Sequence, residues 1–77
     1  MNRKNHTSRF AVCVNNKGYE VSLEPRKIYR VLRDVSAAKH GYIRVIDETG
    51  EDYLFPAARF LPIALPRSAQ KALKLAR

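Results

Sequence analysis

Several residue types are scarce in this chain of 77 residues, and each scarcity excludes a class of protein. The single cysteine, Cys13, cannot form an internal disulfide, so the chain is not a small secreted scaffold held together by disulfides. No run of about 18 apolar residues occurs, so we expect no membrane-spanning helix. Residues 1–9 are polar and basic and lack an apolar stretch, which excludes a secretory signal and favours a cytoplasmic protein.

Metal ligands and phosphate-binding glycines are scarce as well. Cys13 is 7 residues from His6 and 27 residues from His40, and these spacings match no zinc-binding pattern. The three glycines are scattered singly, so the chain has no Gly-rich loop that could hold a phosphate. We therefore expect no metal and no cofactor.

The net charge of +8 comes almost entirely from the two ends of the chain. Residues 1–9 contribute +3 and residues 67–77 contribute +4, whereas residues 10–66 hold eight basic and seven acidic residues. Basic ends attract phosphate without sequence preference, and this attraction weakens steeply with salt. The alternative interpretation is that both ends are solvated tails that aid solubility, and in either case we expect residues 1–9 to be disordered.

Short apolar segments separated by turn residues fill the middle of the chain. We expect strands at residues 10–14, 27–34, 42–46, 51–55 and 60–65, and an extended segment with alternating polarity at residues 19–23. Turns are expected at residues 15–18 and 47–50, one short helical turn within residues 35–41 and one 3₁₀ turn at residues 56–59. Five short strands in so few residues predict a small all-β barrel over residues 10–66, because closing the sheet gives it one core.

A closed barrel of this size is filled by its own side chains and has no pocket for a substrate. Cys13 and His40 are the only conceivable pair of nucleophile and base, so we expect no enzymatic activity. The expected core consists of apolar residues of the strands, namely Val12, Val14, Val21, Leu23, Tyr29, Val31, Ile43, Val45, Leu54 and Phe60.

A basic amphipathic helix is expected over residues 67–77. Ser68 is its predicted N-cap, and Ala69, Ala72, Leu73 and Ala76 follow the spacing of one apolar face. A helix of this length is marginal in water, so it must dock on the barrel, bind another molecule or fray. If the helix binds another molecule, the protein would be an accessory structural subunit docked through this helix.

The run from Gly50 to Ile63 resembles the end of an SH3 domain, in which a hairpin glycine, a strand, a proline that opens a 3₁₀ turn and a closing apolar strand follow one another. Residues 24–32 resemble the approach to the second SH3 strand. Residues 10–65 as a whole are similar to a group of small bacterial proteins with SH3-like barrels, which share the runs Lys27–Leu32 and Gly50–Leu54 followed by Pro56. The resemblance implies a five-stranded SH3-like barrel.

Signalling SH3 domains bind polyproline helices in a groove of aromatic residues. The resemblance implies that Tyr42 takes the place of the groove tryptophan, Pro56 that of the groove proline and Arg59 that of a groove tyrosine. Because the chain has no tryptophan and residues 10–14 replace the aromatic and acidic motif of the first strand, we do not expect a proline-rich ligand.

Surface tyrosines and arginines are the best candidates for a binding site. We hypothesise that a monomeric, non-catalytic module binds a protein partner through an aromatic and arginine-rich face, because aromatic rings offer contact area at low entropic cost. This face consists of Tyr19, Tyr42, Arg44, Tyr53, Pro56 and Arg59. The alternative is that the rings cap the ends of the barrel with their hydroxyl groups in water.

Low-specificity nucleic-acid binding is the second hypothesis. Surface tyrosines would stack on bases, and basic residues of the two ends would contact phosphates. Those basic residues are Arg3, Lys4, Arg9, Arg67, Lys71, Lys74 and Arg77. The four acidic residues at positions 47, 48, 51 and 52 are interpreted as a solvated hairpin tip, because a two-stranded tip offers too few ligands for Ca²⁺.

Overall fold

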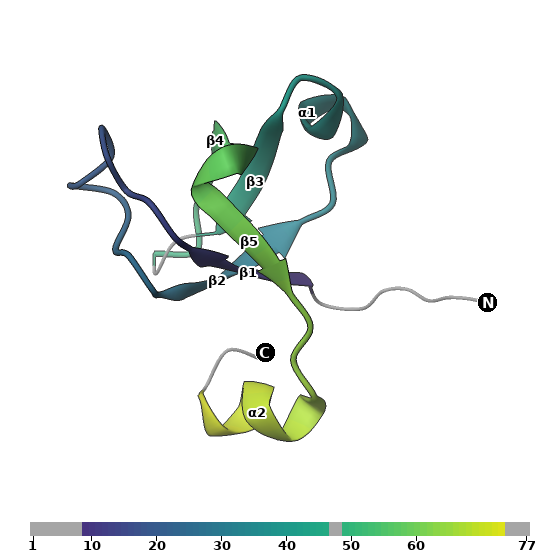
Figure 1. Cartoon of the computed structure of the whole chain (residues 1–77). Helices are drawn as coiled ribbons and strands as arrows, with labels where there is room; N and C mark the ends of the chain where they lie inside the picture. The colour runs from purple at the N-terminus through teal and green to yellow at the C-terminus, as the bar shows by residue number, and fades with distance from the viewer. Residues whose placement is uncertain (1–8, 47–48, 74–77) are drawn as a thin grey trace.

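The computed structural model describes residues 9–46 and 49–73, which form five strands and two short helices (Figure 1). The strands are β1 (Arg9–Cys13), β2 (Ile28–Leu32), β3 (Tyr42–Ile46), β4 (Asp52–Pro56) and β5 (Phe60–Ile63). The helix α1 (Val35–Lys39) joins β2 to β3, the 3₁₀ turn η2 (Ala57–Arg59) joins β4 to β5, and the helix α2 (Arg67–Ala72) follows β5. The prediction of a mostly β fold with a short 3₁₀ turn and a short C-terminal helix is confirmed.

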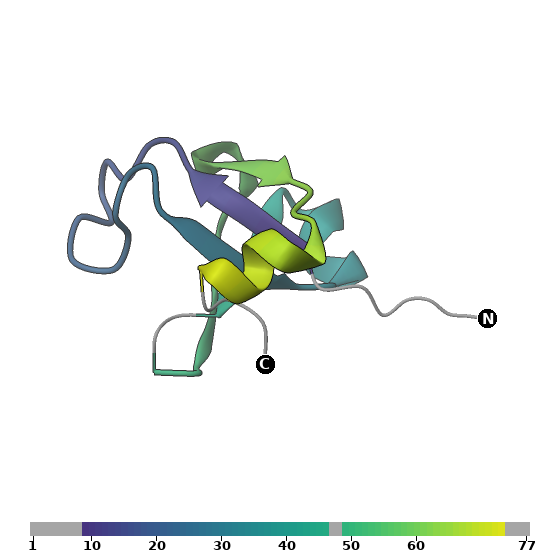
Figure 2. The ribbon, with the colours of Figure 1, turned by 90° about the horizontal axis from the view of Figure 1, so that it is seen from below.

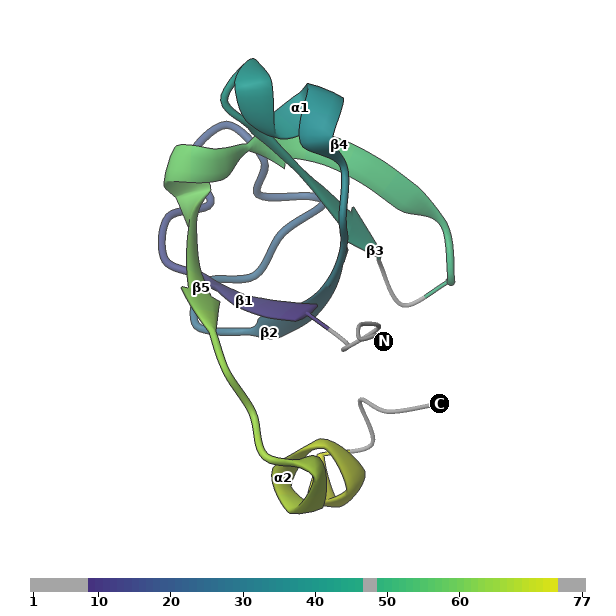
Figure 3. The same cartoon turned by 90° about the vertical axis from the view of Figure 1, so that its right-hand side faces the viewer.

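The five strands form one antiparallel sheet in the order β4-β3-β2-β1-β5. The edge strands β4 and β5 are thus far apart in the sheet, although only the three residues of η2 separate them in the chain. The sheet therefore has to curl, and Figure 3 shows the strands following a curved path around a common interior. The rings of Phe55 on β4 and Phe60 on β5 meet there, with their centroids 6.1 Å apart.

The sheet does not close into a barrel, so the expectation of a closed and solid cylinder is wrong. Among the described residues, β4 and β5 are not paired with each other. The physical reason lies in β5, where Pro62 has no N–H group and the N–H group of Phe60 donates to the carbonyl oxygen of Ala57 in η2. Without outward-facing donors, β5 cannot form a ladder with β4.

The core occupies the inner side of the curled sheet. It consists of Ala11, Cys13, Leu23, Tyr29, Val45, Phe55 and Phe60, and Val31 and Ile43 pack against it while half-buried. The rings of Tyr29 and Phe60 meet edge to face, with centroids 6.0 Å apart, in the arrangement that aromatic pairs prefer. The predicted burial of Leu23, Tyr29, Val45 and Phe60 is confirmed.

The predicted burial of Val12, Val14 and Leu54 is wrong, because other residues of β1 and β4 face the core. Ala11 and Cys13 are fully buried, whereas Val12 is half-buried on the opposite face and Val14, just after β1, is exposed. Every residue from 10 to 14 is apolar, so alternation could not show which ones face inward. On β4, the side chain of Phe55 faces the core and that of Leu54 faces outward. Because these neighbouring residues are both apolar, alternation again could not show which of them faces inward.

The segment from Tyr19 to Leu23 is a turn and not the extended segment that we expected. The N–H groups of Ser22 and Leu23 both donate to the carbonyl oxygen of Tyr19, at 2.9 and 2.8 Å. This winding places Tyr19 and Leu23, four residues apart, on the side of the core. Val21 points the opposite way and is fully exposed, so its predicted burial is wrong.

The expected turn glycines and short helices are present. Gly18 and Gly50 have φ angles of 87° and 90°, as left-handed turn positions require, and α1 begins at Val35 with Asp34 as its N-cap. Residues 47 and 48 of the second turn lie outside the described residues, as do residues 1–8, and Arg9 already belongs to β1.

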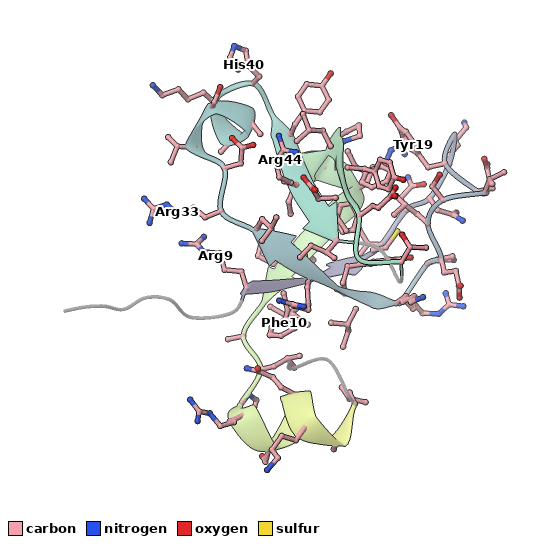
Figure 4. The ribbon with its side chains drawn as sticks, turned by 180° about the vertical axis from the view of Figure 1, so that it is seen from behind. Arg9, Phe10, Tyr19, Arg33, His40 and Arg44 are labelled. Carbon is pink, nitrogen blue, oxygen red and sulfur yellow. The ribbon has the colours of Figure 1, made fainter. Side chains whose placement is uncertain are left out.

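The helix α2 begins at Arg67, the first residue of the expected range, but the prediction of Ser68 as its N-cap is wrong, because Pro66 takes that position. It lies on the outer side of the sheet below β1 (Figures 1 and 2). Phe10 projects from the outer face of β1 toward α2 and is only 3% exposed (Figure 4), so we infer that the helix covers this ring. Leu73 is exposed, and residues 74–77 lie outside the described residues.

Candidate functional site

A groove of about 570 Å³ lies between β4 and the loop that joins β1 to β2; we name it the loop groove. Three consecutive residues of β4 form one wall and residues 21–24 of the loop form the other, while core residues reach the surface between them. The lining residues are Tyr19, Val21, Ser22, Leu23, Glu24, Lys27, Tyr29, Val45, Tyr53, Leu54 and Phe55. The expectation that this fold has no room for a pocket is therefore wrong.

The loop wall of this groove is held by burial and hydrogen bonds. Leu23 is 2% exposed, and its carbonyl oxygen accepts a hydrogen bond of 2.9 Å from the side-chain amide of Asn16. The N–H group of Glu24 donates to the hydroxyl oxygen of Tyr29 over 2.9 Å. Burial raises the pKa of the Tyr29 hydroxyl, and the bond from Glu24 opposes this shift. The bond from Asn16 holds the loop to itself, and the bond between Glu24 and Tyr29 joins the loop wall to β2.

A strained residue follows this wall. Arg26 has a φ of 66°, the left-handed region that non-glycine residues avoid, and follows Pro25 in a turn in which Lys27 donates to the carbonyl of Glu24 over 3.4 Å. The N–H group of Arg26 donates to the carbonyl oxygen of Cys13 over 2.6 Å. This bond places the end of the loop beside β1 and thereby sets the direction of the loop wall.

One end of the loop groove is an aromatic corner. The ring of Tyr19 meets that of Phe55 edge-on with centroids 5.5 Å apart, and the guanidinium of Arg59 lies 5.8 Å from the Tyr19 centroid. Beside it, the pKa of Glu20 is lowered because its carboxylate accepts hydrogen bonds from its own N–H group and from that of Gly18. Arg59 also lowers the pKa of Glu20, so this end pairs a guanidinium with a carboxylate next to an aromatic surface.

The other end of the groove carries carboxylates. The hydroxyl group of Tyr53, a residue that is 45% exposed, donates to Glu51 over 2.6 Å. Across the groove, the Glu24 carboxylate lies 3.8 Å from the ammonium group of Lys27, and that ammonium lies 5.4 Å from the ring centroid of Tyr29. This end of the groove therefore holds both acidic and basic side chains beside the rings of Tyr29 and Tyr53.

A second groove of about 600 Å³ lies beside α1; we name it the helix groove. Tyr42 and Arg44 line it, together with Arg9, Arg33 and mostly apolar residues of β1, β2, β5 and α1. The Arg44 guanidinium donates to Asp34 and to Asp52, both over 2.7 Å, and these bonds raise its pKa. The pKa of Asp34 is lowered first by the hydrogen bond from the Ala37 N–H group and then by Arg44.

The structure therefore distributes the predicted partner-binding residues between two grooves. Tyr19 and Tyr53 line the loop groove with Arg59 at its end, whereas Tyr42 and Arg44 line the helix groove. Figure 4 shows Tyr19 on the side of the molecule opposite Arg9 and Arg33. Pro56 pairs with Tyr42 across the β3–β4 ladder and lines neither groove.

Of the residues predicted to contact nucleic acid, Arg9 is exposed at the start of β1, and Arg67 and Lys71 are exposed on α2. Arg3, Lys4, Lys74 and Arg77 lie outside the described residues. Arg9 and Arg33 point to the same side of the molecule (Figure 4). Arg33 was not among the predicted residues, although its position just after a strand that pairs with residue 9 would have indicated it.

The groove residues Leu23, Tyr29 and Phe55 were not among the predicted site residues either. These residues were interpreted as strand or core residues, and a sequence pattern does not show where a core reaches the surface. The one available signal was Pro25, which favours a turn that bends the loop back toward β1.

The remaining candidates are the pair of Cys13 and His40 and the possible metal ligands. Cys13 is buried in β1 as expected, while His40 is exposed at the end of α1, where its Nδ1 lies 2.9 Å from the carbonyl oxygen of Ser36. Within residues 9–46 and 49–73, no three His, Cys, Asp or Glu side chains gather as metal ligands. No helix in the described part of the chain is long and apolar enough to span a bilayer.

Comparison of the chain with protein-family models, with curated proteins and with solved structures gave no match. The function proposed below therefore depends on the geometry of the two grooves.

Proposed function

We propose that the protein is a non-catalytic protein-interaction module, built on an open SH3-like barrel in which the described strands β4 and β5 do not pair, that binds a peptide segment of a partner protein in the loop groove. The order Gly50, β4, Pro56, η2 and β5 supports the SH3-like interpretation, because the resemblance depends on these features. The observation that carries the proposal is the loop groove itself, in which aromatic side chains line a concave surface of about 570 Å³.

The composition of the loop groove suits a peptide. Tyr19, Tyr53 and Phe55 offer large rings, and tyrosines at the centre of interfaces contribute more binding energy than most other residues. Charged side chains lie beside these rings, and such groups give specificity more than affinity. Arrangements of this kind bind extended segments through a few side-chain anchors.

The experiment uses the full chain and a phage-displayed library of random peptides, selected at physiological salt. The matched variants are Tyr53→Ser in the loop groove and Tyr42→Ser in the helix groove, because both tyrosines are 45% exposed and start from the same residue type. We expect Tyr53→Ser to weaken binding of the selected peptides by about tenfold or more and Tyr42→Ser by less than about twofold.

The proposal fails if the selection enriches no peptide, or if both variants bind the selected peptides as well as the original chain does. Circular dichroism of both variants shows whether they remain folded, so that loss of binding is not confused with loss of structure.

One observation favours low-specificity nucleic-acid binding as a second candidate. Arg9, Arg33 and Tyr42 line the helix groove together, and arginines beside an aromatic ring suit phosphate contact and base stacking. Removal of residues 67–77 and substitution of Arg9 and Arg33 by glutamine should each reduce retention of single-stranded DNA or RNA in gels at low salt. Absence of any retention by the intact chain at low salt would exclude this candidate.

A further inference from the structure

The two edges of the sheet differ in their capacity to accept another strand. In an antiparallel ladder, residues alternate between those that bond to the neighbouring strand and those whose N–H and C=O groups point away from it. One backbone hydrogen bond next to each edge strand fixes this alternation and thereby determines which N–H and C=O groups each edge presents.

On β4, the outward-facing groups include a donor. The N–H group of Ala57 donates to the carbonyl oxygen of Gly41 over 2.8 Å, so the pairs Ile43–Phe55 and Val45–Tyr53 are the bonded pairs of the β3–β4 ladder. The N–H and C=O groups of Leu54 consequently point away from β3. Within the described part of the chain, no strand pairs with this outer edge.

On β5, the outward-facing positions have no donor to offer. The N–H group of Val14 donates to the carbonyl oxygen of Arg59 over 2.9 Å, which makes Leu61 and Ile63 the residues that bond to β1. The outward-facing residues are then Phe60, whose N–H group is bonded within η2, and Pro62, which has none. Prolines at sheet edges are one way in which proteins prevent strand addition.

The outer edge of β4 lies in the loop groove. Tyr53, Leu54 and Phe55 are consecutive and all three line the groove, so the backbone of β4 borders it as well as the side chains. The inner part of the groove is formed by the buried residues Leu23, Tyr29 and Val45. An added strand would direct alternate side chains toward this apolar surface.

We propose, on the basis of the proposed function, that the partner segment binds as a sixth strand antiparallel to β4, with apolar side chains at alternate positions. The segment would run from the Phe55 end of the groove, beside Arg59, to the Tyr53 end, beside Glu51. The occupant is thus an extended segment of a partner protein in which the side chains at every second position are apolar and face the inner part of the groove.

The ligand side of the test uses the highest-affinity peptide from the display selection, resynthesised with one backbone amide N-methylated at a time. We expect losses of about fivefold to tenfold at every second position and smaller losses between them, because only alternate N–H groups face β4. The selected sequences should carry apolar residues at alternate positions. Absence of this alternation, or tolerance of N-methylation at every position, would overturn strand addition.

The protein side of the test compares Leu54→Pro with Leu54→Ala. Proline removes the outward-facing N–H group without removing a ladder bond to β3, so the variant should fold and lose about fivefold to tenfold in affinity for the same peptide. Alanine retains the N–H group and should lose less than about threefold. Equal losses in the two variants would contradict the proposal, and the N-methylated peptides decide if the proline variant does not fold.

The two levels of the proposal fail separately. If Tyr53→Ser abolishes binding but N-methylation has no alternating effect, the loop groove is the binding site and strand addition is wrong. If Tyr53→Ser has no effect on the selected peptides, the proposed function itself is wrong.

Discussion

Leu23 holds the loop wall of the groove, so truncating it should destabilise the whole domain. Leu23→Ala removes three carbons from a side chain that is 2% exposed, which costs about 2.4 kcal/mol at roughly 0.8 kcal/mol per buried methylene. The cavity term adds little, because the residue borders an open groove that can collapse or fill with water. We expect a total loss of about 2.5–3 kcal/mol in the free energy of unfolding.

This loss is large for so short a chain. At roughly 0.05–0.15 kcal/mol per residue, 77 residues have a stability of about 4–12 kcal/mol. Urea denaturation followed by circular dichroism should show a midpoint lowered by about 2.5–3 M, if the slope is about 1 kcal/mol per M.

The matched control is Val21→Ala, two residues away on the same loop. Val21 is fully exposed, so this change should alter the free energy of unfolding by less than about 0.5 kcal/mol. If Leu23→Ala cost less than about 1 kcal/mol, or no more than Val21→Ala, the loop would not be anchored in the core and the groove would lack a fixed wall.

Three further substitutions test the supports of the grooves. Arg26→Gly should raise the free energy of unfolding by up to about 1 kcal/mol, because glycine adopts a φ of 66° without strain; Arg26→Ala, which retains a Cβ, should give no such gain in urea denaturation. Asp34→Asn should be less stable than the original chain at neutral pH. Because the pKa of Asp34 is lowered in the folded state, this difference should shrink as the pH falls below about 4, and a constant difference would contradict the role of its charge. Tyr29→Phe should cost about 1 kcal/mol at neutral pH through the lost bond from Glu24. Because the pKa of Tyr29 is raised by burial, this advantage of the original chain should disappear as the pH rises above about 10, and its persistence there would refute the assignment.

The turn chemistry of this chain could be predicted from its sequence, because glycine and proline constrain the backbone locally. Gly18 and Gly50 adopt the expected left-handed conformation, and Pro56 precedes the expected 3₁₀ turn. Strand phase could not be predicted where both faces are apolar, as in residues 10–14. There the choice of Ala11 and Cys13 as inward residues depends on the space left by the rings of Tyr29 and Phe60, which only the tertiary structure defines.

The candidate site could be predicted in its residue types but not in its arrangement. Tyrosines beside arginines indicated a binding surface, yet a local winding at Tyr19 and the curl of the sheet place Tyr42 in a different groove from Tyr53. The difference between the two sheet edges could be predicted only in part, because a proline such as Pro62 confines its segment to a sheet edge or a bend. Which residues of β4 face outward depends on the register with β3, and no local pattern specifies it.

Amide hydrogen exchange along β4 in the isolated protein tests the central claim most directly, because it needs no ligand. The amides of Tyr53 and Phe55 bond to β3 and should exchange slowly, whereas the outward-facing amide of Leu54 should exchange at least tenfold faster than either. A Leu54 amide as well protected as that of Phe55 would mean that the edge is already covered, and would contradict the proposal that a partner strand binds there.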